Sequence, residues 1–220
     1  MRIILYLLLL TPIFTFGQNQ KYVYTDSVKG VLELSKESSV SSAYASILYL
    51  GDKTDTIQLL RRHKGFQSVK LTEHVSNELD KGQISIYVDT SQYIRGSQEK
   101  RWIDKTDTTV MNYPMAYPVV IENISNDTVY VAYNDIIPIK LEAKDENGFW
   151  RPIEEKNMYL CGFGMTIPYL LPNQIAVTYC RVFEGDFQTK LRLSYTLNNE
   201  LYSNEFTGYI NKDQFNKNKS

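Results

Sequence analysis

The chain has 220 residues with a formal net charge of −1, and 43% of its residues are hydrophobic. A chain of this length can bury a sizeable core, as one large domain or two small ones. The near-neutral charge gives no electrostatic basis for binding nucleic acid or an anionic membrane surface.

The first 17 residues are predicted to be a secretory signal peptide. Met1-Arg2 is a short basic start, and an unbroken apolar run from Ile3 to Leu10 follows it. Thr15-Phe16-Gly17 then places small residues where a cut before Gln18 requires them. A membrane anchor is the alternative, but the apolar segment is short for a span of about 20 residues. We expect an exported protein (periplasmic, outer-surface or secreted) without a membrane span after cleavage.

Residues 18–112 are predicted to form a β-rich portion. Residues 18–25 are expected to be an exposed leader or an edge strand, and residues 45–60 a hairpin whose two strands are joined by a polar connection at 51–55. Further strands are expected at 31–34 and 83–88, and residues 89–112 are expected to be a long loop or hairpin.

One short helix is predicted near residues 72–81. Thr72 can cap it, and Leu71, Val75 and Leu79 recur at the spacing of one helix face. Gly82 then ends it.

Residues 113–211 show the clearer β pattern. Ile139, Leu141 and Ala143 alternate with Lys140 and Glu142, which is the period of a half-buried strand. Asn147-Gly148 predicts a hairpin with a two-residue turn, because both residues accept a positive φ. About seven strands are expected between residues 118 and 210, and residues 212–220 are expected to be a polar tail that frays.

Several motifs in this portion resemble those of bacterial immunoglobulin-like domains. They are Asn123-Ile124-Ser125-Asn126-Asp127-Thr128, the segment 139–150, Leu171-Pro172, Gly185-Asp186-Phe187 and Leu191-Arg192-Leu193. The layout is also similar to the bacterial proteinase-inhibitor sandwich family and to exported proteins of Gram-negative bacteria. The resemblance implies a mainly β fold, with an antiparallel immunoglobulin-like β-sandwich in the C-terminal half.

Two cysteines, Cys161 and Cys180, lie in a chain that is expected to be exported. An oxidising compartment favours a disulfide between them, and closing a loop of this length would stabilise the fold by about 3 kcal/mol. Two buried free thiols are the alternative, because the sequence does not give the distance between the two Cα atoms.

Four aromatic residues flank the Cys161 segment: Trp150, Tyr159, Phe163 and Tyr169. The connection 154–173 is expected to leave the sandwich at one end, where loops often form binding sites. These side chains are therefore candidate ligand contacts for a protein or a glycan, and a flat aromatic strip would favour a glycan. The alternative is that they belong to the core or its rim.

No catalytic, cofactor-binding or metal-ligating residues are indicated by the sequence. His63 and His74 lack the spacing of a known ligand set, and no nucleophile elbow or phosphate-binding glycine loop occurs. An acceptor motif for O-glycosylation of exported bacterial proteins is resembled by Asp55-Thr56-Ile57, Asp107-Thr108-Thr109 and Asp127-Thr128-Val129, and Asp26-Ser27-Val28 is similar. A turn that leads into a strand explains the first three as well.

The sequence thus favours an exported, non-enzymatic binding or interaction module of the bacterial envelope. Two alternatives remain: a secreted hydrolase or hydrolase accessory protein that acts on polysaccharide or peptide, and a protease inhibitor.

Overall fold

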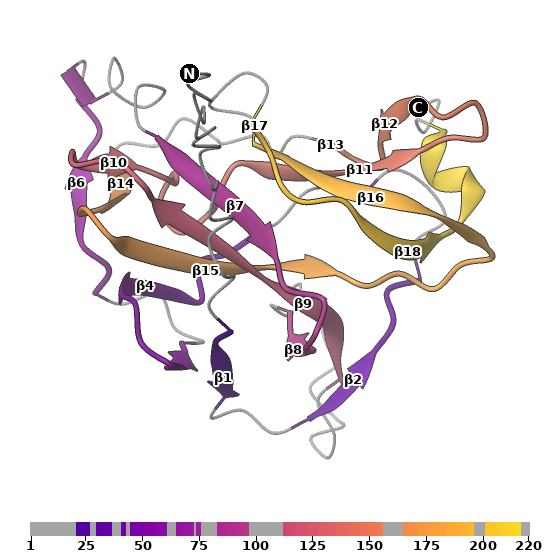
Figure 1. Ribbon diagram of the computed structural model, residues 1–220, viewed down its shortest axis with the longest axis horizontal. Helices are drawn as coiled ribbons and strands as arrows, with labels where there is room; N and C mark the ends of the chain where they lie inside the picture. Colours follow the sequence, from indigo (N-terminus) through magenta and orange to yellow (C-terminus); the bar gives the residue numbers. More distant parts are fainter. Residues whose placement is uncertain are drawn as a thin grey trace, which may run out of the picture.

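The protein is mainly β, with strands arranged in several sheets (Figure 1). The structure, a computed structural model, describes residues 21–26, 30–36, 41–42, 45–60, 65–72, 74–75, 83–96, 112–155, 165–195 and 201–216. In these residues no helix has the length and apolar character that a membrane span requires.

The central sheet is built on the antiparallel pair β9 (Asn112–Asn123) and β15 (Gln174–Arg181). The pairing runs from Ile175 opposite Glu122 to Arg181 opposite Ala116. The other strands of this sheet are β2 (Val31–Glu33), β4 (Tyr49–Asp52), β7 (Ile84–Val88) and β8 (Ile94–Arg95). Both β7 and β8 pair with β9 in the antiparallel sense, so they act as one strand interrupted by residues 89–93.

The second sheet, which we call the outer sheet, is built on the hairpin that the sequence predicts around Asn147-Gly148. Its strands are β11 (Ile139–Lys144), β12 (Trp150–Pro152), β16 (Phe187–Tyr195), β17 (Leu201–Tyr202) and β18 (Phe206–Ile210). Leu141 lies opposite Leu193 in the pairing of β11 with β16. The alternation of leucine with polar residues in both strands places one apolar face against the rest of the molecule.

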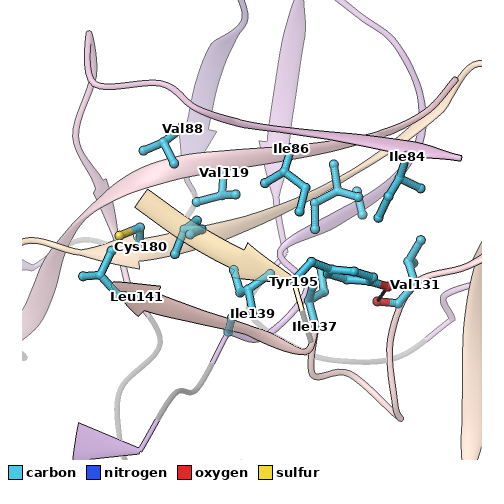
Figure 2. Close-up of a cluster of buried hydrophobic side chains, with 14 of the residues drawn as sticks. Ile84, Ile86, Val88, Val119, Val131, Ile137, Ile139, Leu141, Cys180 and Tyr195 are labelled. Carbon is cyan, nitrogen blue, oxygen red and sulfur yellow. Dashed lines mark hydrogen bonds between the residues drawn. The ribbon is translucent and has the colours of Figure 1, made fainter. Parts of the chain in front are cut away.

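The two sheets share one hydrophobic core (Figure 2). Ile86 and Val119 come from the central sheet, and Leu141 and Leu193 come from the outer sheet. Tyr195 crosses this core, and its hydroxyl donates to the carbonyl of Val131 at 3.2 Å. A buried tyrosine hydroxyl needs such a partner, because leaving it unbonded would cost about 1–3 kcal/mol.

The opposite face of the central sheet is also buried. Strands β1 (Val23–Asp26) and β5 (Thr56–Leu59) form a parallel pair that contributes Ile57 and Leu59 to a second core. These side chains pack with Val120, Ile175 and Val177 of the central sheet. The central sheet is therefore covered on both sides, which explains why β15 reads as a continuous apolar run rather than an alternating one.

Two small sheets complete the described strands. One contains β10 (Val129–Tyr130), β14 (Thr166–Leu170) and β6 (Ser68–Lys70), and the other pairs β13 (Glu154–Glu155) with β3 (Ser41–Ser42).

The hairpin predicted over residues 45–60 is wrong in its pairing. Strand β4 pairs with β15, and β5 pairs with β1. Ile57 and Leu59 are almost fully buried. Burying these side chains against the face of the central sheet stabilises β5 in that position, whereas pairing with β4 in one ladder would not bury them there.

The turn at residues 145–149 also differs from the predicted two-residue form. The amide of Gly148 donates to the carbonyl of Asp145, and the amide of Asp145 donates to the carbonyl of Phe149. Gly148 has a φ of +81°, and Asn147 does not have a positive φ. The loop thus has three residues, with glycine at the one left-handed position, a form that is common in hairpins.

The predicted helix lies mostly outside the described residues. His74 and Val75 are helical, and the amide of Val75 donates to the Thr72 hydroxyl at 3.3 Å, which is the expected cap.

The polar tail does not simply fray. Lys212–Phe215 forms a 3₁₀ turn in which Gln214 is fully buried, and Phe215 packs edge-on against Phe187.

The predicted boundary between residues 112 and 113 falls inside β9. The division into two portions stays a prediction, but both portions contribute strands to the central sheet.

Asn204 joins the two sheets through hydrogen bonds to the edge of β7. Its amide accepts from Val88 N–H at 2.8 Å and donates to Val88 C=O at 3.2 Å. We expect Asn204→Ala to lower the free energy of unfolding by about 2 kcal/mol, because Val88 loses both partners. Guanidinium denaturation measures this value. The exposed Asn126→Ala should change stability by less than about 0.5 kcal/mol, and equal effects of the two variants would contradict the bridging role.

Candidate functional site

The structure does not gather the four predicted aromatic contacts into one site. Trp150 lies in β12 of the outer sheet, and Tyr169 lies in β14 of a small sheet, where it packs edge-on against Tyr130. Strands β12 and β14 are at opposite sides of Figure 1. Tyr159 and Phe163 lie outside the described residues. Trp150 is therefore the predicted contact from which a site can be built.

The predicted disulfide is not formed. Cys180 is a free, buried thiol on β15, where its side chain belongs to the core between the two sheets. Cys161 lies outside the described residues. Burial raises the pKa of the Cys180 thiol well above its ordinary value, and the Glu154 carboxylate acts in the same direction. The thiol is thus a small apolar core group, because the reactive thiolate is disfavoured there.

A buried ion pair lies beside Cys180. Arg181 Nη2 is 3.5 Å from Glu154 Oε1, and the two side chains are only 6% and 10% exposed. Glu154 Oε2 also accepts from the amide of Leu141 in β11 at 3.0 Å. One carboxylate thus connects the end of β15 to the outer sheet.

The cavity next to this pair is too small for an organic substrate. It has a volume of about 10 Å³, which is the space of a single water. Glu154 is its one lining carboxylate, and that group is held by Arg181 and by the Leu141 amide. The carboxylate in this cavity therefore serves to hold neighbouring segments together.

The outer face of the outer sheet carries a row of charged and aromatic side chains, of which Lys190 and Tyr202 are exposed and Glu142 is only 8% exposed. We define the outer face by the residues that alternate with the buried ones: Lys140, Glu142, Lys144, Trp150, Gln188, Lys190, Arg192, Ser194, Tyr202, Thr207 and Tyr209. Trp150 lies opposite Lys144, and Tyr202 lies opposite Ser194 in the neighbouring pair. Five strands thus contribute to one open surface.

Arg192 is the centre of this face. Its Cζ is 4.3 Å from the ring centroid of Trp150 and 3.6 Å from that of Tyr202. Both rings thus lie within cation–π distance of the same guanidinium. Arg192 Nε and Nη2 both bond to Glu142 Oε2, at 3.0 Å and 2.9 Å. Stacking and pairing together fix the guanidinium in one orientation.

Three lysines surround this arginine. Lys140 lies 3.7 Å from Glu142, so one carboxylate faces two cations. Lys144 lies 4.8 Å above the ring of Trp150 and 3.6 Å from Glu205. Lys190 donates to the hydroxyl of Thr207 at 3.1 Å. The face therefore has more positive than negative charge.

Sequence reasoning identified Trp150 but missed Arg192 and Tyr202. Leu191 and Leu193 are buried in the core, and their alternation with Arg192 places the Arg192 side chain on the opposite face of the strand. The cross-strand register decides which side chains it meets, and only the structure gives that register.

The described residues contain no group of three His, Cys, Asp or Glu side chains that could hold a metal ion. Of the residues in the predicted glycosylation motifs, Thr56 and Thr128 are both exposed, next to the buried Ile57 and Val129. Their modification stays a prediction.

Comparison with protein-family models, with curated proteins and with solved structures finds no match to this chain.

The free thiol at Cys180 can be tested by alkylation without reductant. We expect two reactive thiols in the unfolded chain, and no rapid reaction at Cys180 in the folded protein, even as the pH rises through the ordinary thiol pKa of 9.0. Because folding raises this pKa, the folded state should also lose stability relative to the unfolded state above that pH. Mass spectrometry after alkylation counts the thiols. An unfolded chain that takes up no label would show a disulfide and contradict the structure.

The buried ion pair can be tested by Glu154→Gln. The change leaves the Arg181 cation buried without its charge partner, so we expect the free energy of unfolding to fall by about 3–5 kcal/mol. Glu205→Gln is the matched control, since its salt bridge with Lys144 is half exposed and should contribute less than about 1 kcal/mol. Urea denaturation of both variants gives the comparison. Similar losses in the two would contradict a structural role for the Glu154–Arg181 pair.

Proposed function

We propose that the protein is an exported, non-enzymatic binding module of the bacterial envelope. In this proposal an immunoglobulin-like sandwich is the scaffold, and the outer face binds the ligand. The observation that supports it most directly is the stack of Trp150, Arg192 and Tyr202, which comes from three different strands.

The stack supports binding because its charged group is already in place before a ligand arrives. A free arginine loses side-chain entropy when it binds, whereas a guanidinium that is stacked and paired has lost it during folding. Trp150 and Tyr202 also offer large contact areas with few rotatable bonds, which is typical of residues that dominate binding energy.

The rest of the structure is consistent with a scaffold for this face. The residues opposite the face, such as Leu141 and Leu193, are buried in the core. The face lies on paired strands rather than on a loop, and sites on such elements are held more precisely.

The proposal is tested by capture from the envelope fraction of the source bacterium. The tagged mature chain, residues 18–220, is compared with Arg192→Gln and with Lys70→Gln, an exposed lysine on β6. We expect wild type and Lys70→Gln to retain the same envelope component, and Arg192→Gln to retain about tenfold less or none. Lys140 remains beside Glu142, so the variant should still fold, and circular dichroism checks this.

Two results would contradict the proposal. One is a component retained equally by all three proteins, which would place binding elsewhere. The other is turnover by the purified protein in a broad panel of polysaccharide and peptide substrates, which would favour the hydrolase alternative.

A further inference from the structure

The outer face differs in charge from the molecule as a whole. The chain has a net charge of −1. The outer face contributes four cations, Lys140, Lys144, Lys190 and Arg192, against Glu142 and the neighbouring Glu205. This leaves a net charge of +2 on one open sheet face. Such a face attracts a ligand of negative charge and repels cations.

Two of these cations are poised to accept an anionic group. Lys190 is exposed and donates to the neutral Thr207 hydroxyl, and within the described part of the chain no carboxylate compensates its charge. Arg192 has five N–H donors, and its bonds to Glu142 use its Nε and one Nη2 donor. The remaining donors belong to a guanidinium that contacts Trp150 and Tyr202, and the Arg192 side chain is 18% exposed. An oxyanion that bonds to them needs no rearrangement of the side chain.

The shape and chemistry of the face favour a polysaccharide over a peptide. Peptides commonly bind along a free sheet edge or in a groove, and these residues form the flat side of a paired sheet. Between the cations lie hydroxyl, amide and phenol groups of Gln188, Ser194, Thr207 and Tyr209. Such groups match a ligand that has many hydroxyls, and the exposed ring of Tyr202 matches the apolar face of a sugar ring.

From this arrangement we propose that the outer face binds a linear polysaccharide whose sugars bear carboxylates. The carboxylates pair with Arg192 and Lys190, and the sugar rings lie across β16 and β17. This inference depends on the proposed binding function and names its ligand class.

Affinity gel electrophoresis with polygalacturonate cast into the gel tests this inference. The mature wild-type chain should be retarded by polygalacturonate and not by its methyl-esterified form or by neutral dextran. Added salt should weaken the retardation, because an exposed charge contact is screened.

Two charge reversals of equal size locate the contact. Lys190→Glu should weaken retardation about tenfold or more, since it places a carboxylate beside Arg192. Lys70→Glu changes the net charge equally at an exposed position on β6 and should bind like wild type. Arg192→Gln should also weaken binding, and the melting temperature of each variant confirms that it folds.

Any of three results would overturn the inference: no retardation of the wild type, equal retardation by the esterified or neutral polymer, or equal loss in Lys190→Glu and Lys70→Glu. The broader binding proposal has its own test: it fails if capture of an envelope component does not depend on Arg192. A captured protein that depends on Arg192 would therefore keep the binding function and exclude the polysaccharide.

Discussion

The burial of β15 on both faces is the constraint on which the rest of the structure depends. Residues 175–181 of this strand are all buried, and they include the polar Thr178 and Arg181. One face meets the core shared with the outer sheet, and the other meets the core beneath β1 and β5. A strand in this position needs a partner for every polar group, because water does not reach it.

Thr178 and Arg181 both have such partners. The Thr178 hydroxyl donates to the Ser46 carbonyl at 2.8 Å, and Arg181 pairs with Glu154. The first contact fixes the segment before β4, and the second fixes β13 and, through the Leu141 amide, β11. Polar groups that are costly to bury thus determine how neighbouring segments are placed against the central sheet. The Cys180 thiol between them has no such requirement, since a neutral thiol behaves as a small apolar group.

The sequence was most informative where the alternation of apolar and polar residues is enough to predict a strand. The alternation around Ile139 predicted β11, and the glycine at 148 marked the hairpin that joins β11 to β12. The sequence was least informative where contacts with residues far away in the chain determine which strands pair. Residues 45–60 have a hairpin pattern, but burial of Ile57 against the central sheet overrides local pairing. The disulfide was wrong for a related reason, because the position of Cys180 in the core cannot be derived from cysteine count.

In the candidate site, too, one residue could be predicted from the local sequence, whereas its partners depend on contacts between distant segments. Trp150 could be proposed from its residue type and its place beside the connection 154–173, which contains Cys161. Its partners Arg192 and Tyr202 are 42 and 52 positions further along the chain, and the register of four strands, β12, β11, β16 and β17, brings them together. In the proposed function, the apolar residues of β16 belong to the scaffold and its outward residues belong to the binding face, so the same alternation would separate stability from binding. Substitutions on the outer face are expected to change binding with little effect on the core.

Native-state hydrogen exchange of the β15 amides tests most directly whether this two-sided strand organises the whole fold. If it does, the amides of Val177, Thr178 and Tyr179 should exchange only through global unfolding, with an opening free energy equal to that from denaturant unfolding. The amides of β1 should open at lower free energy, because this strand pairs with β5 at the periphery of the second core. Exchange of the β15 amides several kcal/mol below the global value, while β16 stays protected, would contradict the account.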